Sequence, residues 1–537
     1  MVCHSWREIA LSTPKLWNSL HIFVPAPPPT FPDEHYLSMF RERIEGIKRW
    51  LDRSGSLPLT ISLAAGLHDP VRSRARFGLF NVSISPAIRS LQTELMRLIA
   101  RYSRRWKIIA FGANVRLTLD MHPFGMVTDD LPCLESFYSC GNLFWEMQAP
   151  ANGGSETGPS TEQETLVDLL MRAPALRRLQ LSHETISEAA LSLPVAWHNL
   201  IELSFLCPSS HSLEPGQIMQ LLSTKCHSLR TLSIELDSIQ HTAITGRVPS
   251  ISSPPPIWSS VQNLRVAFCC PCFVFISRRE VAFLPSVIEV FEAVTLPSLT
   301  SLSVSFDGTI PPLADISEDN DYDDGDDSYT DHDIRGSDCG HPVFFGIRKL
   351  AFEDLLHRSQ CAGGITHFEL SAPHLFAVET VLRVLRLMGK LELLDFGLMN
   401  MARGGRGSQV GLPQPFRATR WQRGWSGQLF RELLSKEVCS DLKYLSAVGC
   451  TVDDAIPILD FAREKGSLRA IRLEFGLVPW DIIRAFKDSA KMQEAMRMMR
   501  EERGMVLDWR WKEDYRFPPK PRPEDPAAGM PGRSRDW

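Results

Sequence analysis

The chain has 537 residues, of which 44% are hydrophobic and 23% charged, and its formal net charge is −5. This composition is typical of a globular protein, either several domains or one extended repeat array, and it excludes wholesale disorder. The net negative charge argues against nucleic acid as a partner. No signal-peptide pattern opens the sequence, and the longest apolar run, 266–276, is too short to span a bilayer. We therefore expect a soluble cytoplasmic or nuclear protein with reduced cysteines and no membrane contact.

The first twenty residues, MVCHSWREIALSTPKLWNSL, are typical of two short helical segments. Val2, Trp6 and Ile9 fall at i, i+4 and i+7, so they share one face of the first segment. Leu16 and Trp17 form the apolar side of the second. These faces either bind a partner protein or plug the end of the domain that follows.

The order V-C-x-x-W-R-x-I-A-x-S-T-P-x-L-W resembles the second half of an F-box, as found in fungal F-box-like proteins. In that family the motif is a small helical module that binds a Skp-type adaptor, which recruits a cullin-based ubiquitin ligase. The family's first helices have no counterpart before Val2, so residues 1–24 are expected to be a partial F-box whose adaptor binding is weakened or lost. The resemblance implies that Trp6, Ile9, Leu16 and Trp17 contact the adaptor or pack the module's own core.

A proline-rich link, residues 25–36, follows the partial F-box. Apolar residues at helical spacing then predict a helix over 37–53, and alternating apolar residues predict a strand over 57–63. The phrase WLDRSGSLPLTISL, residues 50–63, resembles the segment that opens the substrate-side domain in the same fungal family.

The phrase L-x-x-L-x-L recurs at irregular intervals, and helices predicted over 166–172, 381–388 and 455–465 lead directly into it. Strands connected through helices lie parallel. For residues 37–503 we therefore predict an α/β fold, an irregular leucine-rich-repeat-like solenoid with parallel strands inside and helices outside, curved into an arc. It resembles the degenerate leucine-rich domain that follows many fungal F-boxes. The phrases begin at Leu176, Leu200, Leu229, Leu299, Ile347, Ile365, Leu391, Leu442 and Leu468, with partial versions at Leu134 and Leu264.

Four segments interrupt or end this array. The acidic insert 315–333 is expected to be disordered because its like charges repel. The loop 402–425 combines arginines with Trp421 and Trp425, so it either binds an acidic partner or bases, contacts the acidic insert, or has no binding role. One long helix is predicted over 480–503, and a flexible proline-rich tail over 504–537.

The sequence contains no phosphate-binding loop, zinc-protease motif or nucleophile elbow. The C-x-x-C at Cys269–Cys272 has no second ligand pair, so buried thiols are expected and no metal or cofactor is assigned. We therefore expect a protein-interaction module, the substrate receptor of a cullin-based ligase with an unknown protein substrate. The alternative is a leucine-rich scaffold without ligase association. An enzyme with an unrecognised active site is the third class considered.

Overall fold

The computed structural model describes part of the chain, and it divides into two compact units, Met1–Phe344 with Leu350–Gly364 and Phe345–Lys349 with Ile365–Trp537. The described residues are 4–24, 34–65, 86–111, 129–139, 170, 172–182, 195–206, 222, 225–236, 257–268, 273–277, 280–283, 291–292, 294–306, 350, 352–371, 373, 376–397, 422–435, 438–450, 452–475, 484–486 and 488–511.

Fourteen parallel strands form one sheet, and their order across the sheet follows their order in the sequence, β1-β2-β3-β4-β5-β6-β7-β9-β13-β14-β15-β16-β17-β18. Sequential parallel strands require a crossover after each strand, which is the topology of stacked repeats. The predicted α/β class with a parallel sheet is confirmed, and the strand order is consistent with a leucine-rich-repeat-like solenoid.

The first unit begins with α1 (His4–Leu11), a 3-10 turn (Pro14–Leu16) and β1 (Ser19–Val24). β1 pairs in parallel with β2 (Leu59–Ala65), with Ser19 opposite Thr60 and Val24 opposite Ala65. The prediction of a helical module over 1–24, separated from the array by a link, is therefore wrong for its last six residues. Ile22 and Val24 are buried, and their alternation with exposed neighbours is the pattern of a half-buried strand.

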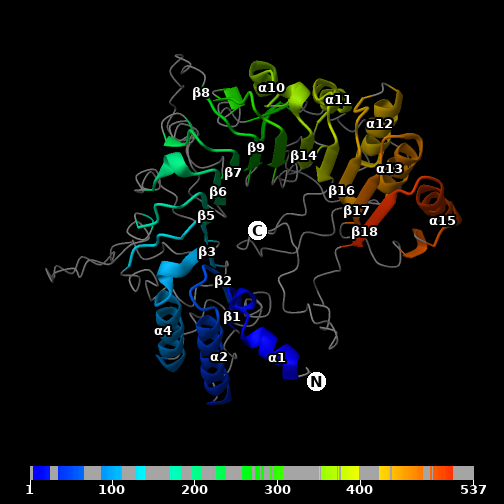
Figure 1. The fold of residues 1–537 in the computed structure, drawn as a ribbon. Helices are drawn as coiled ribbons and strands as arrows, with labels where there is room; N and C mark the ends of the chain where they lie inside the picture. The colour runs from blue at the N-terminus through cyan, green and yellow to red at the C-terminus, as the bar shows by residue number, and fades with distance from the viewer. Residues whose placement is uncertain are drawn as a thin grey trace, which may run out of the picture. The chain divides into compact units, whose positions relative to one another are not determined.

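Helix α2 (Glu34–Arg53) agrees with the predicted helix and buries the apolar stripe from which it was predicted, with Tyr36 in addition. It lies beside α4 (Pro86–Ala100), as Figure 1 shows. A 3-10 turn (Ser103–Arg105) then leads into β3 (Trp106–Phe111). The sequence did not predict α4 or β3, because neither contains the leucine phrase.

The remaining strands of the first unit repeat the same register from one strand to the next, so that Phe137, Leu179, Leu203, Leu232, Leu264 and Leu302 form one continuous inward row. The strands are β4 (Ser136–Ser139), β5 (Arg178–Ser182), β6 (Glu202–Leu206), β7 (Thr231–Leu236), β9 (Asn263–Phe268) and β13 (Ser301–Phe306). A 3-10 turn (Trp197–Asn199) precedes β6.

Two small sheets accompany this unit. β8 (Ile257–Trp258) pairs in parallel with β12 (Val294–Thr295), and β10 (Phe273–Ser277) forms an antiparallel pair with β11 (Glu280–Phe283). The unit ends with α10 (Glu353–Ser359) and a 3-10 turn (Ala362–Gly364). The phrase at Ile347 was expected to form a strand; of this phrase the structure describes only Leu350 and Phe352, which are buried and precede α10.

The second unit alternates strands and helices, and Figure 1 shows its helices along one face of the sheet. The elements are β14 (His367–Ser371), α11 (Val378–Leu387), β15 (Leu393–Gly397), α12 (Gln422–Ser435), β16 (Tyr444–Cys450), α13 (Val452–Glu464), β17 (Ala470–Phe475), α15 (Ala490–Arg497), a π-helical turn (Met498–Glu502) and β18 (Val506–Trp511). The predicted helices over 381–388 and 455–465 correspond to α11 and α13.

The leucine phrases form the core between strands and helices. All their described apolar positions are buried, most of them completely. In the second unit aromatic rings connect sheet to helices, with Phe396 on β15 packing 6.3 Å from Phe430 on α12, and Phe430 packing 5.3 Å from Phe461 on α13. Burial of this area supplies the main stabilisation of the layers, about 1.5–3 kcal/mol for each large side chain.

Two predictions near the C-terminus are wrong. The single helix predicted over 480–503 is interrupted by a turn at Asp488 and Ser489 before α15. The tail predicted from residue 504 begins with a strand, because β18 pairs in parallel with β17, with Val506 opposite Ala470 and Leu507 opposite Ile471. The alternating sequence VLDWRW favours a strand, but it lacks the leucine phrase used to predict the others.

Candidate functional site

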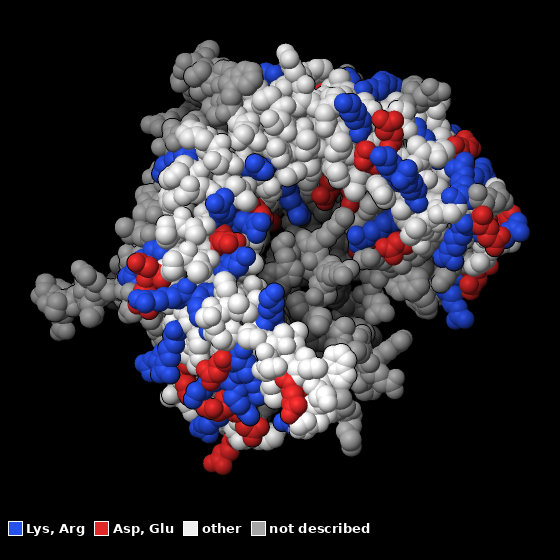
Figure 2. All heavy atoms as spheres, viewed as in Figure 1, with Lys and Arg blue, Asp and Glu red and all other residues white. Residues whose placement is uncertain are grey.

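The N-terminal segment carries most of the large hydrophobic side chains that are exposed among the described residues. Trp6 is 69% exposed, Ile9 54% and Leu16 57%, and no residue of α1 is buried. We call Trp6, Ile9 and Leu16 the N-terminal apolar surface. Figure 2 shows that the surface over α1 is mostly neutral, whereas the surface over α2 and α4 is crowded with charge. The exposure of several large apolar side chains in one short segment makes it a candidate protein-binding site.

Trp17, the fourth residue predicted from the sequence, lies differently. Its ring packs edge-on against Trp50 of α2, with centroids 4.7 Å apart, and the guanidinium of Arg53 lies 4.9 Å from its ring centroid. Its indole N–H donates to the carbonyl oxygen of Ala10 at 2.7 Å. Trp17 therefore anchors the segment on α2, while the other three residues point into solvent. The predicted set of four thus comprises one packing residue and three exposed residues.

Short backbone and hydroxyl contacts shape the turn between α1 and β1. The Thr13 hydroxyl donates to the carbonyl oxygen of Ile9 at 2.6 Å, at the end of α1. The backbone N–H groups of Leu16 and Trp17 donate to Thr13 and Pro14. Thus Leu16 is displayed at a tight turn immediately before the anchor Trp17, and its exposure is fixed by local geometry.

The support beneath the anchor was not predicted from the sequence. Arg105 donates from Nε to the carbonyl oxygen of Leu57 at 2.9 Å and from Nη2 to the hydroxyl of Ser54 at 2.6 Å. Tyr102 donates to Asp52 at 2.6 Å; burial first, and then this aspartate, raise the pKa of Tyr102 to about 12. These bonds hold the C-terminal end of α2, which carries Trp50. In the sequence, Tyr102 and Arg105 stand out only as part of the basic run RYSRRWK at 101–107.

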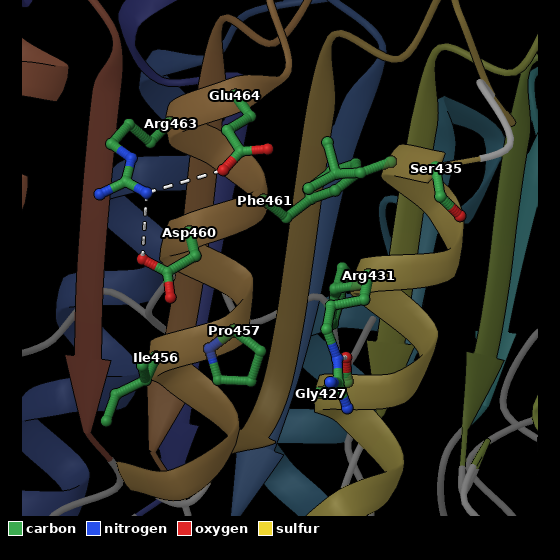
Figure 3. A pocket seen from close by; sticks show the side chains of 11 residues that line it. Gly427, Arg431, Ser435, Ile456, Pro457, Asp460, Phe461, Arg463 and Glu464 are labelled. Carbon is green, nitrogen blue, oxygen red and sulfur yellow. Dashed lines mark hydrogen bonds and ion pairs between the residues drawn. The ribbon is translucent and has the colours of Figure 1, made fainter.

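A groove of about 670 Å³ between α12 and α13 is a second candidate (Figure 3). Phe430, Phe461 and Leu434 contribute its apolar surface, and Pro457 lies inside α13. At its rim Arg463 pairs with Asp460 at 3.9 Å and Glu464 at 3.6 Å. Because these rim charges neutralise each other locally, the groove selects no ligand class by charge.

Four of the described cysteines are packing residues. Cys226, Cys361, Cys439 and Cys450 are buried free thiols, and burial raises the pKa of Cys226 and Cys439 to about 12. Among the described residues, no group of three or more His, Cys, Asp or Glu could hold a metal ion. None of the helices in the part of the chain that the structure describes is long and apolar enough to cross a membrane.

Several sequence predictions fall outside the described residues, namely the C-x-x-C at Cys269–Cys272, the acidic insert 315–333 and most of the basic loop 402–425. The end of that loop is an exception. Trp425 belongs to α12, is 8% exposed, and donates its indole N–H to the carbonyl oxygen of Phe376 at 2.8 Å. The interpretation of Trp425 as part of a loop is wrong, and its role is to pack α12 on the second unit.

Comparison with protein-family models finds no family that matches the chain, and comparison with curated proteins finds no significant match.

Proposed function

We propose that this chain is a protein-interaction module of the F-box type, the substrate receptor of a cullin-based ubiquitin ligase. In this proposal the N-terminal apolar surface binds a Skp-type adaptor, and the parallel sheet recognises a protein substrate. The observation that carries the proposal is the exposure of Trp6, Ile9 and Leu16 beside an anchored Trp17. Apolar side chains of this size gain about 1.5–3 kcal/mol each when fully removed from water, so a partner that covers them gains affinity.

A leucine-rich scaffold without ligase association is the second candidate. The pairing of β1 with β2 favours it, because an N-terminal segment that continues into the first strand can also act as the cap of a repeat array. A cap, however, has no need of three exposed apolar side chains. The two candidates therefore differ in what covers Trp6, Ile9 and Leu16.

The test is a pull-down of a purified Skp-type adaptor by the full chain and by the double variant Trp6→Ala with Leu16→Ala. Both side chains are exposed, so the double variant should fold, and circular dichroism checks this. Deletion of residues 1–24 is a poor test because it also removes β1. The substitution Lys15→Ala, at an exposed position in the same turn, is the matched control.

The proposal expects the full chain and the Lys15→Ala variant to retain the adaptor. It expects the double variant to bind more than tenfold more weakly, since burial of a large apolar side chain contributes about 1.5–3 kcal/mol. If the unaltered chain retains no adaptor, or if the double variant binds as well as the control, the scaffold is the better description.

A further inference from the structure

The turn that follows α1 carries a threonine hydroxyl directly before a proline, in the sequence Ser12-Thr13-Pro14-Lys15. Thr13 is partly exposed, and the other residues of the segment 11–16 are exposed. The backbone of Thr13 is extended, with φ −109° and ψ 89°, as is expected for a residue before proline. Thr13 therefore lies in a surface turn that another protein can reach.

Backbone hydrogen bonds, and not buried side chains, hold this turn. The N–H of Leu16 donates to the carbonyl oxygen of Thr13 at 3.0 Å, and that of Trp17 donates to Pro14 at 2.9 Å. None of the residues 4–16 is buried. A segment without buried side chains opens at a small fraction of the free energy of global unfolding, so a modifying enzyme can straighten the turn while the array stays folded.

A proline after the hydroxyl-bearing residue suits one class of enzyme. Proline-directed protein kinases bind an extended segment in a site that offers no acceptor for the backbone N–H of the residue after the target. Proline has no such N–H, whereas any other residue would leave one unpaired. In the part of the chain that the structure describes, Thr13 is the only serine or threonine directly before a proline.

The hydroxyl of Thr13 stabilises the end of α1, and a phosphate in its place would do the opposite. The hydroxyl donates to the carbonyl oxygen of Ile9 at 2.6 Å, beside a bond from the Ser12 hydroxyl to the same oxygen at 3.2 Å. The last carbonyl groups of a helix carry partial negative charge. An ester oxygen cannot donate to them, and the charge of a phosphate, about −1.5 to −2, is repelled by them.

We propose that Thr13 is a phosphorylation site for a proline-directed protein kinase and that its phosphate unwinds the last turn of α1. In this reaction the Oγ of Thr13 attacks the γ-phosphorus of ATP held by the kinase. A bond from Oγ to phosphorus forms, and the bond from that phosphorus to the oxygen bridging it to the β-phosphate breaks. ADP leaves, and the hydroxyl proton passes to the catalytic aspartate of the kinase.

The inference goes beyond the proposed function, because it makes the N-terminal apolar surface a regulated one. Ile9 of that surface lies in the turn of α1 that the phosphate disrupts, so a partner that needs Trp6, Ile9 and Leu16 together binds the unmodified chain better. Neither the phosphorylation nor its effect on α1 requires that this partner is a Skp-type adaptor.

The test is incubation of the full chain with magnesium ATP and a purified, activated mitogen-activated protein kinase, followed by tryptic digestion and mass spectrometry. Cleavage after Arg7 and Lys15 releases residues 8–15, and fragmentation of this peptide separates Thr13 from Ser12. We expect the phosphate on Thr13. A synthetic peptide of residues 8–20 is incubated in parallel.

Three variants show whether the proline directs the reaction. Thr13→Val keeps the shape of the side chain without its hydroxyl, so residues 8–15 should take up no phosphate. Pro14→Ala should be modified at least tenfold more slowly, because alanine brings an N–H that the kinase leaves unpaired. Ser12→Ala removes the neighbouring hydroxyl; it is the matched control and should be modified as fast as the unaltered chain.

Hydrogen exchange measures the effect on α1. In the phosphorylated chain the amide groups of residues 9–13 should exchange roughly two- to fivefold faster than in the untreated chain, which is the effect expected of a misplaced charge at a helix end. The amide groups of α2 should exchange at an unchanged rate. Kinase treatment of Thr13→Val should not alter exchange in α1, and this control accounts for phosphate at other sites.

The proposal is wrong if the full chain takes up no phosphate on Thr13. Modification of the synthetic peptide alone would then mean that the folded turn excludes the kinase, and modification of neither would mean that the sequence is not a substrate. Equal rates for Pro14→Ala and Ser12→Ala would show that the proline does not direct the reaction. Unchanged exchange in the phosphorylated chain would show that the phosphate leaves α1 intact.

An adaptor pull-down with both forms of the chain is read separately. If the adaptor binds neither form, the proposed function fails, whereas the modification of Thr13 and the unwinding of α1 still stand on the mass spectra and the exchange rates.

Discussion

Trp17 and Trp50 pack edge to face, with ring centroids 4.7 Å apart and an angle of 77° between the ring planes. This pair fixes the N-terminal segment on α2 at one point. The apolar face of α1 is not packed into the core of the described residues, because no residue of α1 is buried. One tryptophan therefore holds the segment in place, whereas another, Trp6, is exposed to solvent.

The two tryptophans should respond differently to substitution. Trp17→Ala should lower the free energy of unfolding by about 2–3 kcal/mol, less than a fully buried tryptophan would lose, since its ring is only half-buried. Trp6→Ala should change it by less than about 0.5 kcal/mol, as is usual for exposed sites. Thermal unfolding followed by circular dichroism measures both. Equal losses in the two variants would mean that Trp6 is also packed in solution.

Arg105 should matter for stability more than its sequence neighbours do. Arg105→Met keeps the aliphatic stem but removes the bonds to Leu57 and Ser54, which should cost about 1–3 kcal/mol. The neighbouring Arg104 pairs with Asp129 on the surface, at 3.2 Å. Arg104→Met should therefore leave the melting temperature nearly unchanged, because exposed ion pairs contribute little. A similar melting temperature for both variants would show that the support of α2 lies elsewhere.

The strands of the array are predictable from sequence because their inward side chains form the core and are therefore apolar. Leu179, Leu203 and Leu232 occupy equivalent positions in register and are nearly inaccessible to solvent. These buried positions belong to the leucine phrases, so the phrases allow the strands to be located from the sequence. β1 and β3 are buried in the same way but use isoleucine, valine and tryptophan, and the described part of β18 buries a single leucine, Leu507, so a search for the leucine phrase misses all three.

The candidate site is less predictable than the fold. Helical spacing shows that Trp6 and Ile9 share a face, but it does not show whether another part of the chain covers that face. Whether that face is covered depends on how α1 is positioned within the first unit. The contact between Trp17 and Trp50, which are far apart in sequence, sets that position. Neighbours across the sheet are hidden for the same reason, because Glu369 and Asp395 come to lie side by side only through strand register.

The C-terminal boundary of the array can be tested by truncation. Removal of residues 504–537 deletes β18 and the inward side chains of Met505 and Leu507, both buried. We expect a loss of about 3 kcal/mol or more in the free energy of unfolding, from the area that β17 and its neighbours then expose. Removal of 518–537 deletes no described strand and is the matched control. If both truncated chains melt at the same temperature, β18 contributes nothing to the array.

The buried thiols should be unreactive in the folded chain. Burial raises the pKa of Cys226 and Cys439 to about 12, and it raises that of Cys450 well above its ordinary value, with Asp454 adding to the effect. Alkylation by iodoacetamide at pH 8, located by mass spectrometry, should therefore leave these three residues unmodified until the protein is unfolded, because the thiolate is the reactive form.

The same shifts predict how stability changes in alkali. The thiol of the unfolded chain loses its proton near pH 9, whereas the folded thiols of Cys226 and Cys439 keep theirs until about pH 12. The unfolded state therefore binds fewer protons in this window, so the free energy of unfolding should fall as the pH rises from about 9 to 12. The double variant Cys226→Ala with Cys439→Ala should show a shallower decline over that range. A decline as steep as that of the unaltered chain would assign the alkaline loss to other groups.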